Sequence, residues 1–248
     1  MSVSLALIAL APGAAIGSFL NVVAGRVPHR ISLVRPRSAC PHCGSHIAPY
    51  DNVPLLSYAL LRGRCRSCHA PIGLRYPAVE LATTLLVAAS FFVFGFSGHA
   101  LLAAFFCAVL VVLSAVDLEH RILPDRITLP SAAVVLVAHT ALEPRFEWAV
   151  GALGASLFLF LAVLAYPRGM GMGDVKLALL LGAMLGKAVA VALMLGMLSA
   201  LVPAVVLLAR HGPAARKMGI PFGPFLALGS IVALFAGDRL LGAYLGLF

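Results

Sequence analysis

Long runs of apolar residues, separated by short polar stretches, make up most of the chain. A helix of roughly 20 mainly apolar residues is long enough to cross the hydrocarbon core of a bilayer. We expect such helices at residues 2–24, 77–95, 99–116, 127–142, 148–166, 174–190, 191–209 and 223–245. Only Gly186 and Lys187 indicate a turn between the sixth and seventh helices. The pattern predicts an all-α polytopic membrane protein with about eight transmembrane helices.

The composition supports this class and excludes others. Hydrophobic residues make up 62% of the 248 residues and charged residues 11%, and the mean hydropathy is +1.04. Soluble domains are about 45–50% apolar and about 25% charged. A soluble enzyme, a disordered chain and a secreted disulfide scaffold are therefore all excluded.

The basic residues indicate the orientation of the chain. There are 18 Lys and Arg against 9 Asp and Glu, and they lie between the apolar runs. Membrane topology therefore explains the excess better than nucleic-acid binding does. With residues 25–76 in the cytoplasm, the basic residues expected inside are Arg26, Arg30, Arg35, Arg37, Arg62, Arg64, Arg66, Arg75, Arg121, Arg126, Arg168, Lys176, Arg210, Arg216 and Lys217. Those expected outside are Arg145, Lys187 and Arg239.

Residues 25–76 differ from the rest of the chain. They hold four of the five Cys, eight Arg and six Pro, so we expect a compact polar insert after a first helix that is retained as a membrane anchor. The four Cys form two C-x2-C pairs, Cys40/Cys43 and Cys65/Cys68, which is the spacing of a closed, structural four-thiolate zinc site. Free thiols, or disulfides if the topology is inverted, are the alternatives.

Three histidines of the insert are further candidates for zinc ligands. His42, His46 and His69 are possible substitutes for a cysteine. Cys107 lies within an apolar run and is expected to be a small core residue.

Two carboxylates have unusual positions. Asp117 ends a long apolar run, and Asp174 opens a later one after a glycine-rich stretch. Two predicted spans separate them, so both are expected at the cytoplasmic edge of the bilayer. Acidic residues at such depth indicate function. A close pair shares one proton, so that one carboxylate activates water while the other polarises a carbonyl group, as in aspartyl proteases. The structural alternatives are an N-cap for Asp174 and a pair with Arg121 for Asp117.

Several neighbours have expected supporting roles. Gly171 and Gly173, together with Gly169, would let the backbone approach a substrate closely. Asp125 is expected to cap the following helix, with a supporting role as the alternative. Lys176 could hold an anion or extend to the interface.

Two further acidic residues were considered. Glu80 is either an interfacial helix-start charge or a partner for a basic group. Glu119 is expected to face solvent.

The ordered motifs resemble those of bacterial type IV prepilin peptidases, the bifunctional leader peptidase/N-methyltransferases. The matching segments are GSFLNVVAGRVP at 17–28, the two Cys pairs, LLRGRC with RYPAVEL, VDLEHRILPDRITLP at 116–130, GMGMGDVKL at 169–177 and PFGPFLALG at 221–229. The resemblance implies that Asp117 and Asp174 are the catalytic aspartates. It implies a chain of three parts: a first helix at 1–24, a methyltransferase-associated zinc loop at 25–76 and a peptidase bundle at 77–248.

The resemblance also implies substrates and cofactors. The expected substrates are type IV prepilins and type II secretion pseudopilins, cut after a Gly at the cytoplasmic face of the inner membrane. The new N-terminal residue is then methylated from S-adenosylmethionine, with Gly63 as a candidate cofactor-binding residue. Membrane lipids are expected partners of the basic face, and nucleic acid is not.

Three other interpretations remain open at this point. They are a peptidase without methyltransferase activity, a proton-coupled transporter that uses intramembrane aspartates, and a scaffold organised by zinc. The last predicts that Asp174→Asn has no effect.

Overall fold

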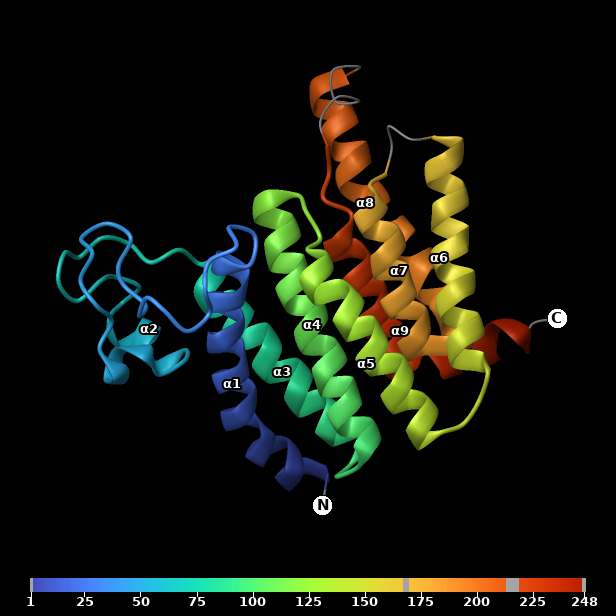
Figure 1. The fold of residues 1–248 in the computed structure, drawn as a ribbon, viewed down its shortest axis with the longest axis horizontal. Coiled ribbons are helices and arrows are strands. Elements are labelled where there is room, and N and C mark those ends of the chain that lie inside the picture. The colour runs from blue at the N-terminus through green and yellow to red at the C-terminus, as the bar shows by residue number, and fades with distance from the viewer. Residues whose placement is uncertain (1, 167–169, 213–218, 247–248) are drawn as a thin grey trace. The chain divides into compact units, whose positions relative to one another are not determined.

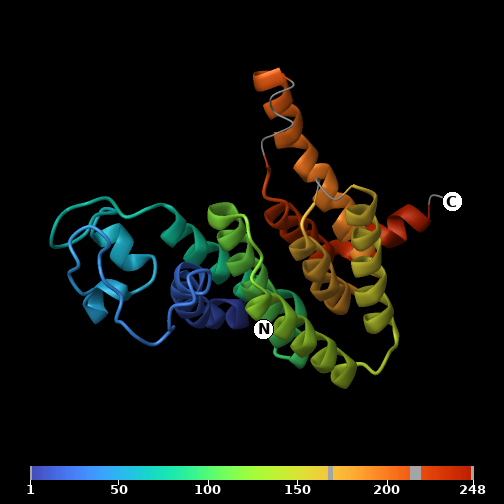
Figure 2. The ribbon, with the colours of Figure 1, turned by 45° about the horizontal axis from the view of Figure 1, so that its top comes forward.

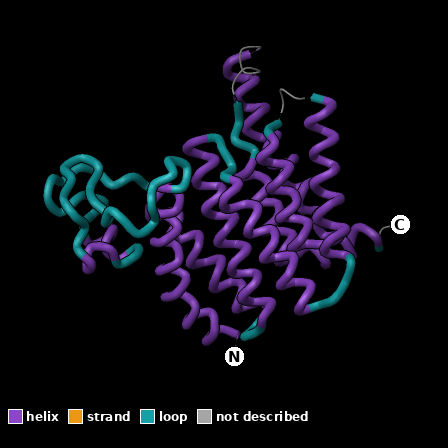
Figure 3. Tube along the Cα trace, in the orientation of Figure 1, coloured by secondary structure: helices purple, strands orange, loops and turns teal. Residues whose placement is uncertain are grey.

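The computed structural model describes residues 2–166, 170–212 and 219–246 of the chain. Within these ranges the backbone is helix and loop, without a β-strand, as Figure 3 shows. This confirms the predicted all-α class. The helices are α1 Ser2–Arg26, α2 Leu56–Leu60, α3 Arg75–Phe94, α4 Gly98–His120, α5 Asp125–Leu142, α6 Glu147–Ala165, α7 Met172–Leu185, α8 Val189–His211 and α9 Gly223–Leu245, with short 3₁₀ turns η1 Pro49–Asn52 and η2 Gly186–Ala188.

Each predicted apolar run forms a helix in the structure. Five helical stretches are long and apolar enough to cross a membrane: Val3–Arg26, Arg75–Phe94, Gly98–His120, Glu147–Ala165 and Met172–His211. The last stretch contains both α7 and α8. These stretches make the chain a multi-pass membrane protein, and the number of eight spans stays a prediction.

The break between α7 and α8 comes earlier than expected. The sequence predicts a boundary at 190/191, but α7 ends at Leu185 and η2 follows directly. Gly186 has φ +52°, a conformation that glycine adopts at little cost and that ends a helix. Four residues weighed in the sequence, Arg168, Gly169, Arg216 and Lys217, lie outside the described residues.

The chain divides into two compact units, residues 1–116 and 117–248. In the first, α1 packs along α3. Ala9, Val87 and Ala104 form a small buried cluster that joins these two helices to α4. The cysteine-bearing loop between α1 and α3 makes a separate lobe beside the helices, as Figures 1 and 2 show. The three-part division predicted from the sequence stays a prediction.

In the second unit, α7 is the most enclosed helix. It packs against both α5 and α6, while α8 packs against α9. Ten of its fourteen residues are buried, which fits a helix that is apolar around its whole circumference. Asp174 stands in the first turn of this helix, so the fold places a carboxylate at the end of its best-packed element.

Two glycines allow α6 and α7 to touch. A β-carbon on Gly151 would lie 2.8 Å from the carbonyl oxygen of Gly182 and 2.8 Å from Gly186 Cα. Membrane helices use small residues in this way to bring their backbones together. Gly151 and Gly182 therefore serve the close packing of α6 on α7.

We therefore predict that Gly151→Ala destabilises the protein by about 1–3 kcal/mol, the usual cost of overpacking. Gly154→Ala on the same helix is the matched control, because a β-carbon there meets nothing within 4 Å. Thermal unfolding in detergent measures both. Equal melting temperatures for the two variants would contradict the close packing of α6 on α7.

Candidate functional site

Asp117 lies in the last turn of α4, with 6% of its surface exposed. Its Oδ2 accepts a hydrogen bond from the backbone N–H of Gly223, 2.9 Å away at the start of α9. A β-carbon on Gly223 would lie 2.8 Å from this oxygen, so a larger residue there would force the carboxylate to move. Arg121, the partner considered from the sequence, also acts on Asp117 through its charge.

Asp174 lies in the first turn of α7, with 9% of its surface exposed. Its Oδ2 accepts a hydrogen bond from the N–H of Gly171, the N-cap residue, at 3.3 Å. This is the acidic half of a capping box. The sequence offered Asp174 as a possible N-cap. In the structure the N-cap is Gly171, and Asp174 is the third residue after it.

The structure brings the two aspartates together. Their carboxyl groups are near enough to interact electrostatically. Leu123 lies close to two glycines near the aspartates. A β-carbon on Gly173, next to Asp174, would lie 3.1 Å from Leu123 Cβ, and one on Gly223, the partner of Asp117, would lie 3.3 Å from Leu123 Cδ2. Two buried carboxyl groups, each held by one glycine N–H, form the candidate catalytic pair.

Asp125 and Lys176, which lie a few residues after Asp117 and Asp174 in the sequence, form an ion pair with each other. Lys176 Nζ lies 2.7 and 2.8 Å from the two carboxylate oxygens of Asp125. The expectation that Asp125 caps α5 is wrong, because Pro124 occupies the N-cap position and Asp125 is the first helical residue. Lys176 has this carboxylate as its partner instead of reaching freely to the interface. Both side chains are partly exposed, so the pair contributes little to stability.

The four loop cysteines gather into one cluster. Their sulfur atoms all lie within 4.8 Å of one another, and Cys40 Sγ lies 3.8 Å from Cys68 Sγ. A tetrahedral zinc ion with Zn–S bonds of about 2.3 Å separates its sulfurs by about 3.8 Å. The cluster therefore fits the predicted four-thiolate site, and it consists of the cysteines without His42, His46 or His69.

The two halves of the cluster repeat one backbone pattern. The N–H of Cys40 bonds to the carbonyl of Ser45, and the N–H of Cys65 bonds to the carbonyl of Ala70, both at 2.9 Å. Gly44 and His69, which follow the second cysteine of each half, have φ of +72° and +57°. Two matching turns offer two sulfurs each, as a tetrahedral ion requires.

Hydrogen bonds favour the thiolate, the form that binds a metal, at two of the four cysteines, whereas burial and the neighbouring cysteines raise the pKa of Cys68 to about 11. The hydroxyl and the backbone of Ser45 lower the pKa of Cys43 to about 6. Backbone N–H groups of Cys68 and Ser67 lower the pKa of Cys65. Cys107, by contrast, is fully buried in α4, as expected for a core residue.

Glu80 and Gly63 belong to the first unit. Glu80 Oε2 accepts a hydrogen bond from the N–H of Leu55 at 2.8 Å, so it fastens the loop to α3. Gly63 has φ +68°, and a β-carbon there would lie 2.8 Å from the hydroxyl oxygen of Tyr58. Glu119 is exposed and lies 3.6 Å from the ring of His120, which agrees with its expected solvent position.

Three residues with no role predicted from the sequence make contacts at these sites in the structure. Gly223 supplies the N–H for Asp117, and Leu123 fills the space between the glycines. Asn21 is buried and donates to the carbonyl of Tyr76 at 3.0 Å. The only available signals were the glycine of PFGP for Gly223 and a polar residue inside an apolar run for Asn21.

A multi-pass helical membrane protein with two adjoining, buried carboxyl groups has the parts of an intramembrane aspartyl protease. Comparison with known proteins narrows this class. Residues 104–208 match the type IV leader peptidase family, and residues 12–94 match the bacterial peptidase A24 N-terminal domain. The chain belongs to the type IV leader peptidase family.

Named relatives agree with this assignment. The chain is 38% identical to a prepilin leader peptidase/N-methyltransferase of Burkholderia pseudomallei, over 92% of this chain and 84% of that protein. It is 37% identical to the one of Pseudomonas aeruginosa, over 94% and 91%, and 36% identical to the one of Bacillus subtilis, over 94% and 95%. No solved structure matches the chain.

The cysteine cluster yields a prediction about metal content. We expect the purified chain to carry about one zinc ion, and Cys40→Ala to lose it, because three sulfurs leave the tetrahedral site open. Cys107→Ala is the control, since this cysteine is buried in α4 away from the cluster. Elemental analysis of both variants decides the matter. Full zinc occupancy in Cys40→Ala would count against the site.

Proposed function

We propose that the chain removes the leader peptide from type IV prepilins and then methylates the new N-terminal residue. The observation that carries the peptidase half is the buried pair of Asp117 and Asp174, each with one oxygen occupied by a glycine N–H. The names of the relatives support the choice of substrate and the second activity. Pseudopilins of type II secretion are proposed as further substrates.

The pair suits hydrolysis because two neighbouring carboxyl groups share one proton. The ionised carboxylate takes a proton from water as the water oxygen bonds to the scissile carbonyl carbon. The other carboxyl group gives its proton to the carbonyl oxygen. When the C–N bond then breaks, the protonated carboxyl group gives its proton to the leaving nitrogen, and a hydroxyl of the tetrahedral intermediate returns a proton to the ionised carboxylate. The products are one carboxylic acid and one amine, and the pair again shares one proton.

The glycine N–H groups fix which oxygen of each aspartate reacts. Because Oδ2 of Asp117 and Oδ2 of Asp174 each accept a backbone hydrogen bond, the second oxygen of each group is left to face water or substrate. Holding the groups in place beforehand lowers the cost of reaching the transition state.

The methyl-transfer half concerns the first unit. S-adenosylmethionine supplies an electrophilic methyl group on a sulfonium. When bound, this donor would supply its methyl group to the neutral N-terminal amine of the processed substrate. The loop with the zinc-type cluster and Gly63 is the proposed region for this step, and zinc is proposed to be structural.

The proposed setting is the inner membrane, with the loop and the aspartate pair on the cytoplasmic side. The support is the bias of basic residues, fifteen against three, between the two sides of the predicted topology. The basic face suits anionic lipid head groups, and nucleic acid is not a proposed partner. A peptidase that lacks methyl transfer is the narrower alternative.

The peptidase proposal predicts that Asp117→Asn and Asp174→Asn each lower leader cleavage by at least about 10²-fold. An asparagine oxygen can still accept the glycine N–H, so folding is expected to persist. Asp125→Asn, which alters only an exposed ion pair, is the control and should keep cleavage. The assay measures product masses from a synthetic prepilin in detergent. Full cleavage by either active-site variant would show that the catalytic pair is misassigned.

The methyl-transfer proposal predicts a selective effect of Gly63→Ala. A methyl group there would push on the Tyr58 hydroxyl, and a non-glycine residue at positive φ costs about 1–2 kcal/mol. We expect methylation to fall while cleavage continues. Gly95→Ala is the control, because Gly95 has a similar φ of +65° and a β-carbon there meets nothing within 4 Å. Mass spectrometry of the mature N-terminus separates the two activities, and unchanged methylation in Gly63→Ala would contradict the assignment.

A further inference from the structure

The first unit contains a cavity of about 490 Å³. Its walls are the end of α1, the cysteine-bearing loop and the start of α3. Ligand sites in proteins commonly have volumes of about 300–1,000 Å³. The cavity is therefore large enough for a small molecule or for the end of a peptide, and its polar groups indicate which kind.

Asn21 lines the cavity and carries a buried acceptor that has no partner among the described residues. It is only 7% exposed, and its Nδ2 donates to the carbonyl oxygen of Tyr76. Because a carbonyl can only accept, this bond fixes the amide with Nδ2 toward Tyr76. Its Oδ1 is buried and has no hydrogen-bond partner within the described part of the chain. An unsatisfied acceptor costs free energy unless a ligand donates to it.

Glu80 stands one helical turn away on the facing helix. A β-carbon on Gly17 of α1 would lie 2.7 Å from Glu80 Cα of α3. One turn further along α1, Asn21 forms its hydrogen bond to Tyr76, which lies one turn before Glu80 on α3. The two helices thus bring Asn21 and Glu80 to the same wall of the cavity. Glu80 uses Oε2 for the N–H of Leu55, and a carboxylate has further acceptor capacity.

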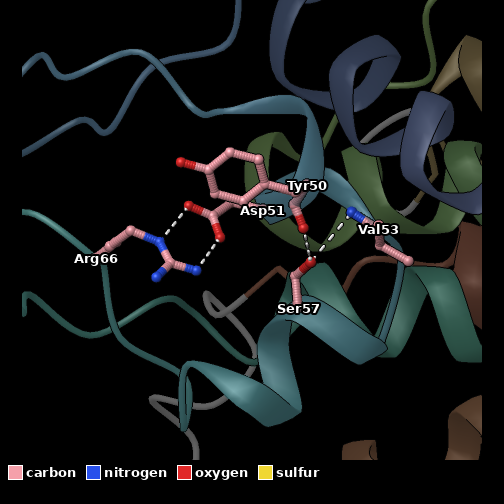
Figure 4. A network of polar contacts seen from close by, with 5 residues as sticks. All are labelled: Tyr50, Asp51, Val53, Ser57 and Arg66. Carbon is pink, nitrogen blue, oxygen red and sulfur yellow. Dashed lines mark hydrogen bonds and ion pairs between the residues drawn. The ribbon is translucent and has the colours of Figure 1, made fainter.

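The two arginines that line the cavity already have partners. Arg26 donates to the carbonyl oxygens of Ser32, Leu33 and Pro36. Arg66 binds both carboxylate oxygens of Asp51, as Figure 4 shows. An anionic ligand would have to compete for these donors, whereas the acceptors on α1 and α3 have capacity for a donor.

The loop wall is tied together around this space. Ser57 Oγ donates to the carbonyl of Tyr50 at 3.0 Å and accepts from the N–H of Val53 at 3.1 Å (Figure 4). Arg66 lies 5.4 Å from the centre of the Tyr50 ring. Two carboxylates line the cavity, those of Asp51 and Glu80. Asp51 is paired with Arg66, whereas no contact between Glu80 and a cationic side chain is present among the described residues.

We propose that this cavity binds a primary ammonium group, with Asn21 Oδ1 and the Glu80 carboxylate as its acceptors. An ammonium carries three donors and a positive charge, which suits one neutral and one charged acceptor. The proposal rests on the proposed methyl transfer, in which two ammonium groups take part. One belongs to the amino-acid end of the methyl donor, and the other is the protonated form of the substrate's new N-terminus, which must lose a proton before it can take the methyl group.

The test uses the full chain in detergent and two variants. Glu80→Gln keeps an oxygen for the N–H of Leu55 and removes only the charge. Asn21→Leu removes the free acceptor at similar size, together with the hydrogen bond to the carbonyl of Tyr76. The matched control is Glu147→Gln, because Glu147 likewise accepts a backbone N–H, from Lys187, and belongs to the second unit. Leader cleavage and thermal unfolding report whether each variant is folded.

Two pairs of probes distinguish the sources of the ammonium. S-adenosylhomocysteine is compared with 5′-methylthioadenosine, which lacks the amino-acid end. A labelled peptide of the mature pilin N-terminus with a free amine is compared with the same peptide acetylated. We expect Glu80→Gln and Asn21→Leu to weaken one ammonium probe by tenfold or more and to leave its partner probe and leader cleavage unchanged.

Each outcome decides the proposal. Selective loss of S-adenosylhomocysteine assigns the methyl donor to the cavity, and selective loss of the free peptide assigns the methyl acceptor. If wild type binds a probe and both folded variants bind it equally well, the ammonium site is overturned while methyl transfer stands. If wild type cuts the leader but binds no ammonium probe and adds no methyl group, methyl transfer and the site both fail.

Discussion

Burying a carboxyl group among apolar helices requires a hydrogen-bond partner for it, and this requirement organises the second unit. Asp117 at the end of α4 is satisfied by the N–H of Gly223 at the start of α9, and Asp174 by the N–H of Gly171 before α7. Helix ends leave such N–H groups unpaired, so they are available for this use. The pair can therefore exist only where helix ends meet, and this is where water and a substrate backbone could also reach it. Packing inside the unit, such as the close contact of α6 with α7, holds those ends in register.

The first unit meets the same requirement with different groups. Asn21 and Glu80 would be costly on apolar helices, and each is satisfied in part by backbone: the carbonyl of Tyr76 and the N–H of Leu55. The difference lies in what is left over. In the aspartate pair a second oxygen on each group is left for chemistry, whereas at the α1–α3 wall a neutral amide oxygen has no donor among the residues that the structure describes. One unit is thus suited to proton transfer and the other to recognition.

Much of this could be predicted from the sequence because its signals are local. The apolar runs gave the helices, the paired C-x2-C spacing gave the cysteine cluster, and the rarity of acidic residues drew attention to Asp117 and Asp174. Gly186 and Lys187 were identified as the only turn signal between α7 and α8, but the boundary of the spans was placed a few residues later because the apolar run continues through them; the helix ends at Leu185, before Gly186 with its positive φ. The partners Gly223 and Leu123 could not be derived, since each contact joins positions distant in the chain. Asp125 was taken for a cap because its partner, Lys176, is 51 residues away.

The cysteine cluster has a consequence for the cavity. The four sulfurs close a ring of chain from Cys40 to Cys68, and Tyr50, Val53 and Ser57 of the cavity wall belong to that ring. A metal held by the sulfurs would reduce the conformations open to the ring, and a ligand in the cavity would do so from inside. Two ligands that favour the same ordered state must strengthen each other by an equal factor. Metal affinity would then become a measure of cavity occupancy, so that a chelator competition could report what the cavity binds without following methyl transfer.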